Sequence, residues 1–364
     1  MPVRRAARTI RLLIPAAVLG LTALMPGLSS ASTYPAHFSR NCSSIGDPYV
    51  ARQPVLRQCG FEFIPRRAAR ALPGGGHAYV YRVGGIKEEV IVPPRGFNPL
   101  TAPAARLREY GIPTAKQVGS RSRWAEIMRA ARFAPPPRQL IAGGPVNPGG
   151  EFSNNPWAGY VATGNSEFDF AQASYTEPYI GSSQSRCSNL AVGSWVGIGG
   201  FTGSTLAQAG TSFGDNGQPN LHNEFQELVI DAQGDFAPVW YGKVDFNDSI
   251  YAKVAWNSST SRYNYFVSDS NNGHTMDVTA FASHYDGNSA EVITEAPGNH
   301  DLANFGKITF TGSKIGTTGS SATSLGSWRP TNLTMTDGSG NTMAFADPIY
   351  GSGEDFSNND RSCD

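Results

Sequence analysis

Basic side chains are scarce in the second part of this 364-residue chain. Residues 1–150 hold 21 of the 29 lysines and arginines but only six of the 29 acids, which leaves eight bases and 23 acids for residues 151–364. The formal net charge of zero therefore combines a part near +15 with a part near −15. The arginines of the first part are scattered among proline, alanine and glycine, and the aromatic-rich part is acidic. Since a nucleic-acid-binding surface needs clustered positive charge, we expect no nucleic-acid partner.

Long apolar runs are also lacking, except near the N-terminus. Four arginines between positions 4 and 11 precede an apolar stretch from Leu12 to Leu28, and residues 29–31 are small. This pattern predicts a secretory signal peptide over residues 1–31. A membrane anchor is the alternative, but the run is short and contains two prolines. No later segment has 18 consecutive apolar residues. We expect a secreted, extracellular protein that leaves the membrane once the signal is removed.

Cysteines are few, and recognisable metal motifs are absent. Cys42, Cys59, Cys187 and Cys363 fit an oxidising compartment, and four cysteines allow three pairings. The division of charge suggests Cys42–Cys59 and Cys187–Cys363, because each pair would then survive a cut between the two parts. No C-x-x-C or H-E-x-x-H spacing occurs and the six histidines are scattered, so we expect neither a metal site nor a cofactor.

The basic segment over residues 32–147 contains two local patterns. Runs at Ala78–Val83 and Ile86–Val92 flank two glycines, which predicts a hairpin. Apolar residues recur at Trp124, Ile127, Met128 and Ala131, which predicts a helix that Ser122 caps and a triple proline ends. Arginines surround this apolar stripe, so the helix either presents a solvated face on a small lobe or docks on the acidic part.

A Gly/Pro/Asn-rich linker, residues 141–151, follows that segment and is the natural place for a proteolytic cut. After Phe152 the texture changes to short alternating runs about ten residues apart, separated by turn clusters. No stretch there sustains a helical period for three turns. The pattern is typical of an all-β, antiparallel two-sheet sandwich of the jelly-roll or concanavalin-like kind, and we assign it to residues 148–364. The runs are centred on Ile250–Trp256, Tyr263–Val267, Met276–Ala280 and Lys307–Thr311.

One motif suggests a serine nucleophile but fails in its context. Residues 210–214 match G-x-S-x-G around Ser212. That motif exposes its serine at a turn between a strand and a helix. The turn cluster Asp215–Pro219 follows here and cannot begin a helix, so we do not expect a serine hydrolase.

Carboxylates on predicted strands are more informative. The period of two places Phe225, Glu227 and Val229 on one face of their strand, and Glu291, Ile293 and Glu295 together on another. Because eight bases cannot pair with 23 acids, some carboxylates must stand unpaired or close together. That environment raises the pKa of at least one carboxyl and makes general acid/base catalysis possible.

A series of motifs resembles the glutamic peptidases, or eqolisins. The series consists of W-V-G-I-G-G at 195–200, L-A-Q-A-G at 206–210, F-Q-E-L at 225–228 and A-E-V-I-T-E at 290–295, with N-P-W-A-G at 155–159 and L-A-N-F-G at 302–306 in the same order. The resemblance covers about residues 150 to 311. It implies a two-sheet sandwich that cleaves polypeptides with a Gln/Glu pair, without a cofactor.

The resemblance also implies site residues. Its catalytic glutamine corresponds to Gln208 and its catalytic glutamate to Glu295, while Trp195 and Glu227 correspond to residues of the substrate cleft. Departures from the family pattern leave this pair intact but alter its surroundings. Gly199 stands where the family usually has aspartate, Val292 where it has tryptophan, Ala209 where Q-T-G has threonine, and F-Q-E-L at 225–228 where it has W-Y-E-W.

Two other functions remain open from the residues alone. A glycoside hydrolase could use Glu291 with Glu295, or Glu224 with Glu227, as its two carboxylates. A non-catalytic carbohydrate-binding sandwich could use aromatic side chains as stacking platforms, although core packing is the simpler role for them. The aromatic candidates are Trp195, Trp240, Tyr241 and Trp256.

The opposite charges suggest an intramolecular partner. We expect a monomeric zymogen in which the basic segment covers the acidic catalytic face as an inhibitor. Acid would protonate carboxylates paired with arginine, release the segment and expose the linker to self-cleavage.

Overall fold

The computed structural model describes residues 70–83, 86–131, 156–164, 167–180, 190–201, 205–213, 222–230, 239–273, 275–282, 285–296, 301–317 and 321–361, with short pieces at 52, 54, 61–62, 133 and 138–140. All of them belong to a compact unit that runs from Pro35 to Asp364. The predicted signal peptide and all four cysteines lie outside the described residues. Within the described part, no helix is both long and apolar enough to cross a membrane.

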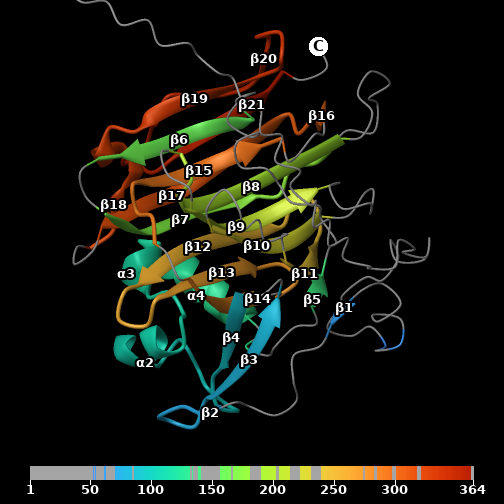
Figure 1. The fold of residues 1–364 in the computed structure, drawn as a ribbon. Helices are drawn as coiled ribbons and strands as arrows, with labels where there is room; N and C mark the ends of the chain where they lie inside the picture. The colour runs from blue at the N-terminus through green and yellow to red at the C-terminus, as the bar shows by residue number, and fades with distance from the viewer. Residues whose placement is uncertain are drawn as a thin grey trace, which may run out of the picture. The chain divides into compact units, whose positions relative to one another are not determined.

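Two antiparallel sheets form the body, as the alternating sequence runs predict (Figure 1). In sheet A, strands β9, β8 and β15 lie side by side in the middle, and Trp195 on β8 pairs with Ile293 on β15 and Gly210 on β9. A short strand, β16 (Asp301–Leu302), adds to β8 in parallel. The order across sheet A is β1 (Phe61–Glu62), β5 (Arg138–Leu140), β11 (Val239–Val244), β10 (His222–Ile230), β9 (Thr205–Phe213), β8 (Leu190–Gly199), β15 (Ser289–Glu295), β6 (Trp157–Thr163) and β19 (Thr331–Thr336).

Sheet B includes the predicted hairpin of the basic segment. The hairpin strands β3 and β4 pair with each other, and β4 then pairs with β14 of the body. Strand β19 joins the two sheets, because it pairs with β6 near Thr331 and with β20 near Thr336. The order across sheet B is β2 (Arg70–Ala71), β3 (His77–Val83), β4 (Ile86–Val92), β14 (Thr275–Phe281), β13 (Arg262–Asp269), β12 (Ser249–Asn257), β7 (Phe168–Thr176), β17 (Lys307–Thr317), β21 (Phe356–Asp360) and β20 (Thr342–Ala346), with β18 (Thr323–Ser324) beside β17.

Three described helices lie in the basic segment, where the sequence predicts one, the last of the three. They are α2 (Ala104–Glu109), α3 (Ala115–Val118) and α4 (Arg121–Ala130). The predicted stripe of α4 is buried at Trp124, Ile127 and Met128, but the cap is Ser120 rather than Ser122. The Ser120 side chain accepts a hydrogen bond of 3.2 Å from the backbone N–H of Arg123, which the first turn leaves without an intrahelical partner. In the described part of the body the helical element is a short 3-10 turn, η2 (Leu325–Trp328).

The main core fills the space between the sheets. Strand alternation sends Ile250, Ala252 and Val254 of β12 into this core, together with Val196 and Ile198 of β8. Tyr251 and Lys253 therefore face the other side of sheet B. We call the side of each sheet that is turned away from the other sheet its outer face.

Candidate active site

The outer face of sheet A has its own apolar cluster. Trp195 alternates with the core residues Val196 and Val192, and it packs with Trp157, Val161, Leu206, Ile293 and Leu333 on this face. The indole rings of Trp157 and Trp195 meet edge to face, with centroids 5.0 Å apart. This packing fixes the Trp195 indole in one position on the sheet.

The predicted site residues gather around Trp195. Gln208 alternates with the core residues Ala207 and Ala209 of β9, so it lies on the outer face, and Glu295 shares that face with Ile293 of β15. Both side chains are about one-twentieth exposed, at 5% each. The Cα of Glu227 on β10 pairs directly with that of Gln208, while its side chain lies outside the described part of the structure. Sequence and register thus place all of these positions on neighbouring strands.

One hydrogen bond links two of the predicted residues. The indole Nε1 of Trp195 donates to Oε2 of Glu295 over 2.6 Å, although the residues are 100 positions apart in the chain. An N–H donor stabilises the charged form of a carboxylate and restricts its rotation. Trp195, which the family resemblance assigns to the substrate cleft, therefore also contacts the predicted catalytic glutamate directly.

Two rows of residues cross the outer face, and each contains a glutamate, a glycine and a polar side chain. In one row Glu295 of β15 lies opposite Gly193 of β8, which lies opposite Ser212 of β9. In the other row Glu291 lies opposite Gly197, which lies opposite Gln208. Glu295 is four residues along β15 from Glu291, or about 13 Å at the usual strand rise. The direct cross-sheet neighbour of Gln208 is therefore Glu291.

The two glycines differ in the space above them. A Cβ atom at Gly197 would lie 2.8 Å from a ring carbon of Trp195 and 3.2 Å from Oε2 of Glu291. A Cβ atom at Gly193 would meet a ring carbon of Trp195 at an ordinary 3.6 Å. The Glu291 side chain thus reaches over Gly197 toward the β9 strand that carries Gln208, and only a glycine leaves room for it.

Glu291 is the buried carboxyl that the charge count predicted in general terms. It is fully buried, and neither carboxyl oxygen has a hydrogen bond of good geometry to a described residue. Burial raises the pKa of Glu291 well above its ordinary value; the charge of Asp286 acts in the same direction, and the nearby Ser289 hydroxyl opposes it. The period of two did place this residue beside Glu295, but the motif series drew attention to Glu295 alone.

The departures from the family pattern at Gly199 and Val292 lie in different surroundings. Gly199 has a φ of +83°, and a Cβ there would lie 2.1 Å from the carbonyl oxygen of Thr205, so this backbone excludes any side chain. Val292 is fully buried in the core between the sheets. The loss of the tryptophan at this position therefore changes the core and leaves the outer face with Ile293 and Trp195.

Several other sequence hypotheses can be compared with the structure. Ser212 lies inside β9 and not at a strand-to-helix turn, so the G-x-S-x-G match forms no nucleophile elbow. Trp256 stacks on Tyr285 with ring centroids 4.7 Å apart and packs against the core, as expected for a packing residue. The side chains of Trp240 and Tyr241 lie outside the described part. Among the described residues, no cluster of three or more His, Cys, Asp or Glu could hold a metal ion.

The described helices of the basic segment do not lie on the catalytic face, and the inhibitory role expected of the whole segment stays a prediction. They pack on Tyr251 and Phe266, which belong to the outer face of sheet B, on the far side of the sandwich from Gln208 and Glu295. The reason is the apolar stripe of α4, which finds an aromatic surface there. Charge complementarity, on which the expectation was based, does not decide this packing.

Three solved structures are similar to part of this chain. The structure resembles scytalido-glutamic peptidase solved with a transition state analog inhibitor, with 17% identity, 57% of this chain and 98% of that chain covered and a TM-score of 0.46. It also resembles SCP-B, an eqolisin solved with the tripeptide Ala-Ile-His, with 19% identity, 57% of this chain and 98% of that chain covered and a TM-score of 0.43. For aspergilloglutamic peptidase from Aspergillus niger the identity is 21%, the coverage is 47% of this chain and 99% of that chain, and the TM-score is 0.37. A comparison with curated proteins returned no match.

The family model of the peptidase A4 family matches residues 155–348. The matched residues span more than half of the chain and include the strands that carry Trp195, Gln208, Glu227 and Glu295. The chain therefore belongs to the peptidase A4 family.

Proposed function

We propose that this peptidase is a secreted endopeptidase that cleaves polypeptides with Glu295 and Gln208. The observation that carries the proposal is the hydrogen bond from Trp195 to Glu295, on the same outer face as Gln208. Peptide hydrolysis by this route requires a carboxylate, here held by a buried indole N–H, and an amide, here on the same face two strands away and four residues along the sheet. The tripeptide bound to SCP-B supports a polypeptide as the substrate.

The chemistry follows from the two groups. Glu295 takes a proton from a water molecule, and the water oxygen attacks the carbonyl carbon of the scissile bond. The Gln208 amide donates a hydrogen bond to the oxygen that becomes negative in the tetrahedral intermediate. Collapse of this intermediate breaks the C–N bond, and Glu295 returns its proton to the leaving amine. No metal or other cofactor takes part.

Trp195 has a positioning role in this scheme. Its Nε1 donates a hydrogen bond to Oε2 of Glu295 and fixes the plane of the carboxylate. We assign Glu227, whose Cα pairs with that of Gln208, to contact with the substrate beside the amide. The pair thus acts on the outer face of β15, β8, β9 and β10.

We also propose that the chain is made as a monomeric zymogen that is processed in the linker over residues 141–151. Leu140, at the end of β5, lies on one side of the central strands of sheet A, and Pro156, before β6, lies on the other. The described ends of this linker therefore flank the strands that carry Gln208 and Glu295. This placement supports self-cleavage of the linker more than inhibition by the helices of the basic segment.

The decisive experiment is the digestion of a denatured protein, from about pH 2 to 7, by wild type, Gln208→Ala and Glu295→Gln. Inhibitors of serine, metallo- and aspartic peptidases are present throughout. We expect wild-type activity to survive them, kcat to fall about 10²- to 10³-fold for Gln208→Ala and about 10²- to 10⁴-fold for Glu295→Gln. Glu167→Gln, which changes an exposed glutamate, is the matched control. Full activity in both site variants would overturn the proposal.

A further inference from the structure

The outer face of sheet B has an apolar surface that the basic segment completes. Tyr251 of β12 and Phe266 of β13 are buried, with exposed fractions of 1% and 0%, in one cluster with side chains of the segment. Loss of the segment would return both rings to water, which is unfavourable for large aromatic side chains. The segment side chains of this cluster are Leu72, Ala78, Leu107, Tyr110, Ile112, Val118, Trp124, Ile127 and Met128.

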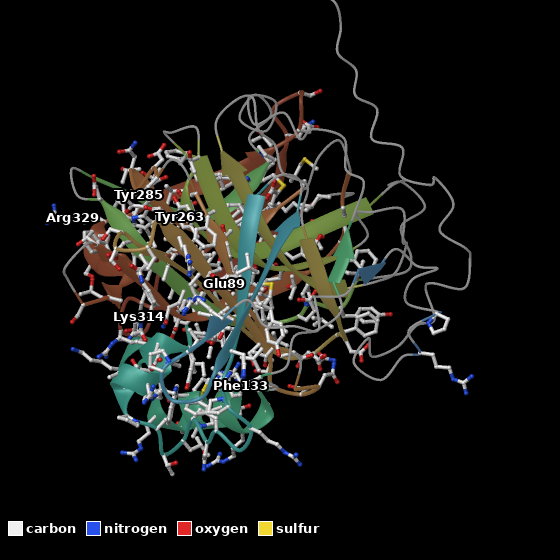
Figure 2. All side chains as sticks on the ribbon, turned by 60° about the horizontal axis from the view of Figure 1, so that its bottom comes forward. Glu89, Phe133, Tyr263, Tyr285, Lys314 and Arg329 are labelled. Atoms are coloured by element: carbon white, nitrogen blue, oxygen red, sulfur yellow. The ribbon has the colours of Figure 1, made fainter. Side chains whose placement is uncertain are left out.

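The hairpin of the segment is also part of sheet B. Strand β4 pairs with β14, with Val90 opposite Val278, and the Thr279 hydroxyl donates to the carbonyl oxygen of Glu89 over 3.0 Å. The buried carboxylate of Glu89 forms ion pairs with Arg70 of the segment and Arg262 of the body. Figure 2 shows Glu89 on the hairpin where it joins the sheet. In the ion pair between Glu89 and Arg262 the acid belongs to the segment and the base to the body. The division of charge would suggest the reverse, a base on the segment and an acid on the body.

A buried lysine of the body is satisfied by the backbone of the segment. Lys253 is 4% exposed, and its Nζ donates to the carbonyl oxygen of Gly111 over 2.7 Å. Gly111 has a φ of +74°, and a Cβ there would lie 2.7 Å from Nδ2 of Asn264 and 2.8 Å from Oδ1 of Asp277. The backbone at Gly111 therefore fits closely against a polar row on β12, β13 and β14. While the segment is docked and keeps water from this ammonium group, the Gly111 carbonyl supplies a hydrogen bond that water would otherwise provide.

A second polar contact repeats this arrangement. Gln172 of β7 donates from Nε2 to the carbonyl oxygen of Gln117, at 2.6 Å, and accepts from the Tyr251 hydroxyl at 2.8 Å. Gln172 is 1% exposed, so the segment carbonyl again satisfies a buried donor of the body. Apolar side chains, strand pairing and buried polar groups of sheet B thus all depend on the same segment.

We infer that residues 70–131 are a permanent structural partner of sheet B, and that they stay docked as a separate chain after the linker over 141–151 is cut. The mature protein is then a complex of two chains, with the segment on the face opposite to Gln208 and Glu295. In this arrangement, activation requires a cut in the linker but no departure of the helices.

The titratable groups at the interface oppose release by mild acid. Burial raises the pKa of Asp277 to about 7, against the opposing effects of Lys253 and Asn264, and burial lowers the pKa of Lys253 to about 8. On a separated body both groups would face water. Between about pH 7 and 4 the docked state holds the Asp277 proton more tightly than the separated state does, so a fall in pH favours docking. Lys253 remains protonated over this range.

Other charged groups at the interface include Glu89, Arg70 and Arg262, together with Lys116 and Arg123 of the segment and Lys314 of the body. The buried Glu89 carboxylate pairs with Arg70 of the segment and with Arg262 of the body. The arginines keep their charge throughout.

The test uses the full-length chain with a recognition sequence for a site-specific protease inserted in the linker. The Glu295→Gln background prevents self-digestion, and association is read without reference to activity, so the test does not depend on the proposed function. After the cut, we expect both pieces to elute together in size-exclusion chromatography at the mass of the uncut protein, at pH 7 and at about pH 5. The inference would be overturned if the two pieces eluted separately at pH 7, or if the body precipitated after the cut and left the segment in solution.

Two glycines of the segment provide a matched pair of variants. Gly111 and Gly96 both have positive φ, at +74° and +81°, but an added Cβ at Gly96 meets nothing within 4 Å. We expect Gly111→Ala to weaken association of the cut pieces about tenfold or more relative to Gly96→Ala, because it displaces buried hydrogen-bonding groups. Equal affinities for the two variants would show that this contact does not hold the segment.

A second measurement covers the case in which Gly111→Ala fails to fold. Amide hydrogen exchange at Ile127 and Met128 of α4 can be compared in the chain before and after the cut, without any docking variant. Docked helices keep these amides protected, so unchanged protection supports the inference. Loss of protection at both amides after the cut would contradict it.

Discussion

At the scale of single residues, the glutamate that the sequence motif does not select has the most unusual surroundings. Glu291 is fully buried, reaches over Gly197 and lies in the same cross-sheet row as Gln208. Burial without a good hydrogen bond disfavours the charged carboxylate, which explains the direction of its pKa shift. The folded protein therefore becomes less stable, relative to the unfolded chain, as pH rises above the ordinary pKa of a glutamate.

Glu291→Gln tests this pH dependence. Gln keeps the shape of a neutral carboxyl but has no charge to lose, so we expect the variant to gain stability over wild type as pH rises. The gain in the free energy of unfolding should be near zero at about pH 4 and on the order of 1–3 kcal/mol at about pH 7. Urea unfolding at the two pH values measures it, with the exposed Glu167→Gln as the control. A difference that is equal at both pH values would contradict the raised pKa.

The two cross-row glycines give a second residue-scale prediction. Gly197→Ala would push a methyl group against Trp195 and Glu291, whereas Gly193→Ala meets ordinary contact distances. We expect Gly197→Ala to destabilise the protein by about 1–3 kcal/mol through overpacking and to reduce peptidase kcat by disturbing Trp195. Gly193→Ala should unfold close to the wild-type denaturant concentration. Thermal or urea unfolding of both variants measures the difference. An equal loss of stability in the two variants would contradict the close contact of Gly197 with Trp195 and Glu291.

At the scale of elements, the apolar period of α4 predicts its buried face but not its start. Ser120 and Ser122 are both suitable capping residues in the sequence, and their hydroxyl oxygens lie 3.0 Å apart. The structure selects Ser120, because α4 begins at Arg121 and the N–H of Arg123 points to the Ser120 oxygen. Helix ends depend on where the preceding turn directs the chain, and α3, capped by Thr114 and ended by Gly119, sets that direction.

Substitution of the two serines separates these assignments. Ser120→Ala removes an acceptor from the first turn of α4, and we expect a loss of about 1 kcal/mol in the free energy of unfolding. Ser122→Ala lies inside the helix at an exposed position and should change stability by no more than about 0.5 kcal/mol. Denaturant unfolding of both variants provides the comparison. A larger loss in the free energy of unfolding for Ser122→Ala than for Ser120→Ala would show that Ser122 caps the helix, as the sequence suggests.

At the scale of the whole molecule, the opposite net charges of the two parts do not dictate how the parts meet. The helices follow an apolar stripe onto Tyr251 and Phe266, and the ion pair with Arg262 uses an acid of the segment. Surface charges interact weakly in water and are screened by salt, whereas buried aromatic area is stabilising at every ionic strength. The division of charge thus describes the composition of the two parts and not their interface.

Asp277→Asn tests the interface at this scale. In the cut protein, Asn removes the carboxyl whose pKa docking raises, so the part of the pH dependence that favours docking in acid should disappear. We expect the dissociation constant of the Asn variant to rise relative to that of wild type as pH falls from about 7 to 5. Titration of the separated and remixed pieces at both pH values measures the change. Parallel pH profiles for the two proteins would contradict the role of Asp277.

The sequence by itself determined the local and repetitive features of this protein. Strand runs such as Ile250–Trp256, the hairpin over 78–92, the buried face of α4 and the sandwich class follow from periodicity, because the inward and outward faces of a strand or helix are written in the order of residues. The peptidase family followed from the ordered motifs around Trp195, Gln208, Glu227 and Glu295, which the family match supports.

Only the tertiary structure decided which of these residues meet. The register of β15, β8 and β9 places Gln208 opposite Glu291, directs the Trp195 indole to Glu295, and leaves room for Glu291 above Gly197. The docking of the basic segment on sheet B likewise depends on Tyr251, Phe266 and Lys253, which are far from it in the chain. Periodicity assigns a residue to a face, but contact across strands depends on pairing register and on packing between distant elements, which one linear pattern does not encode.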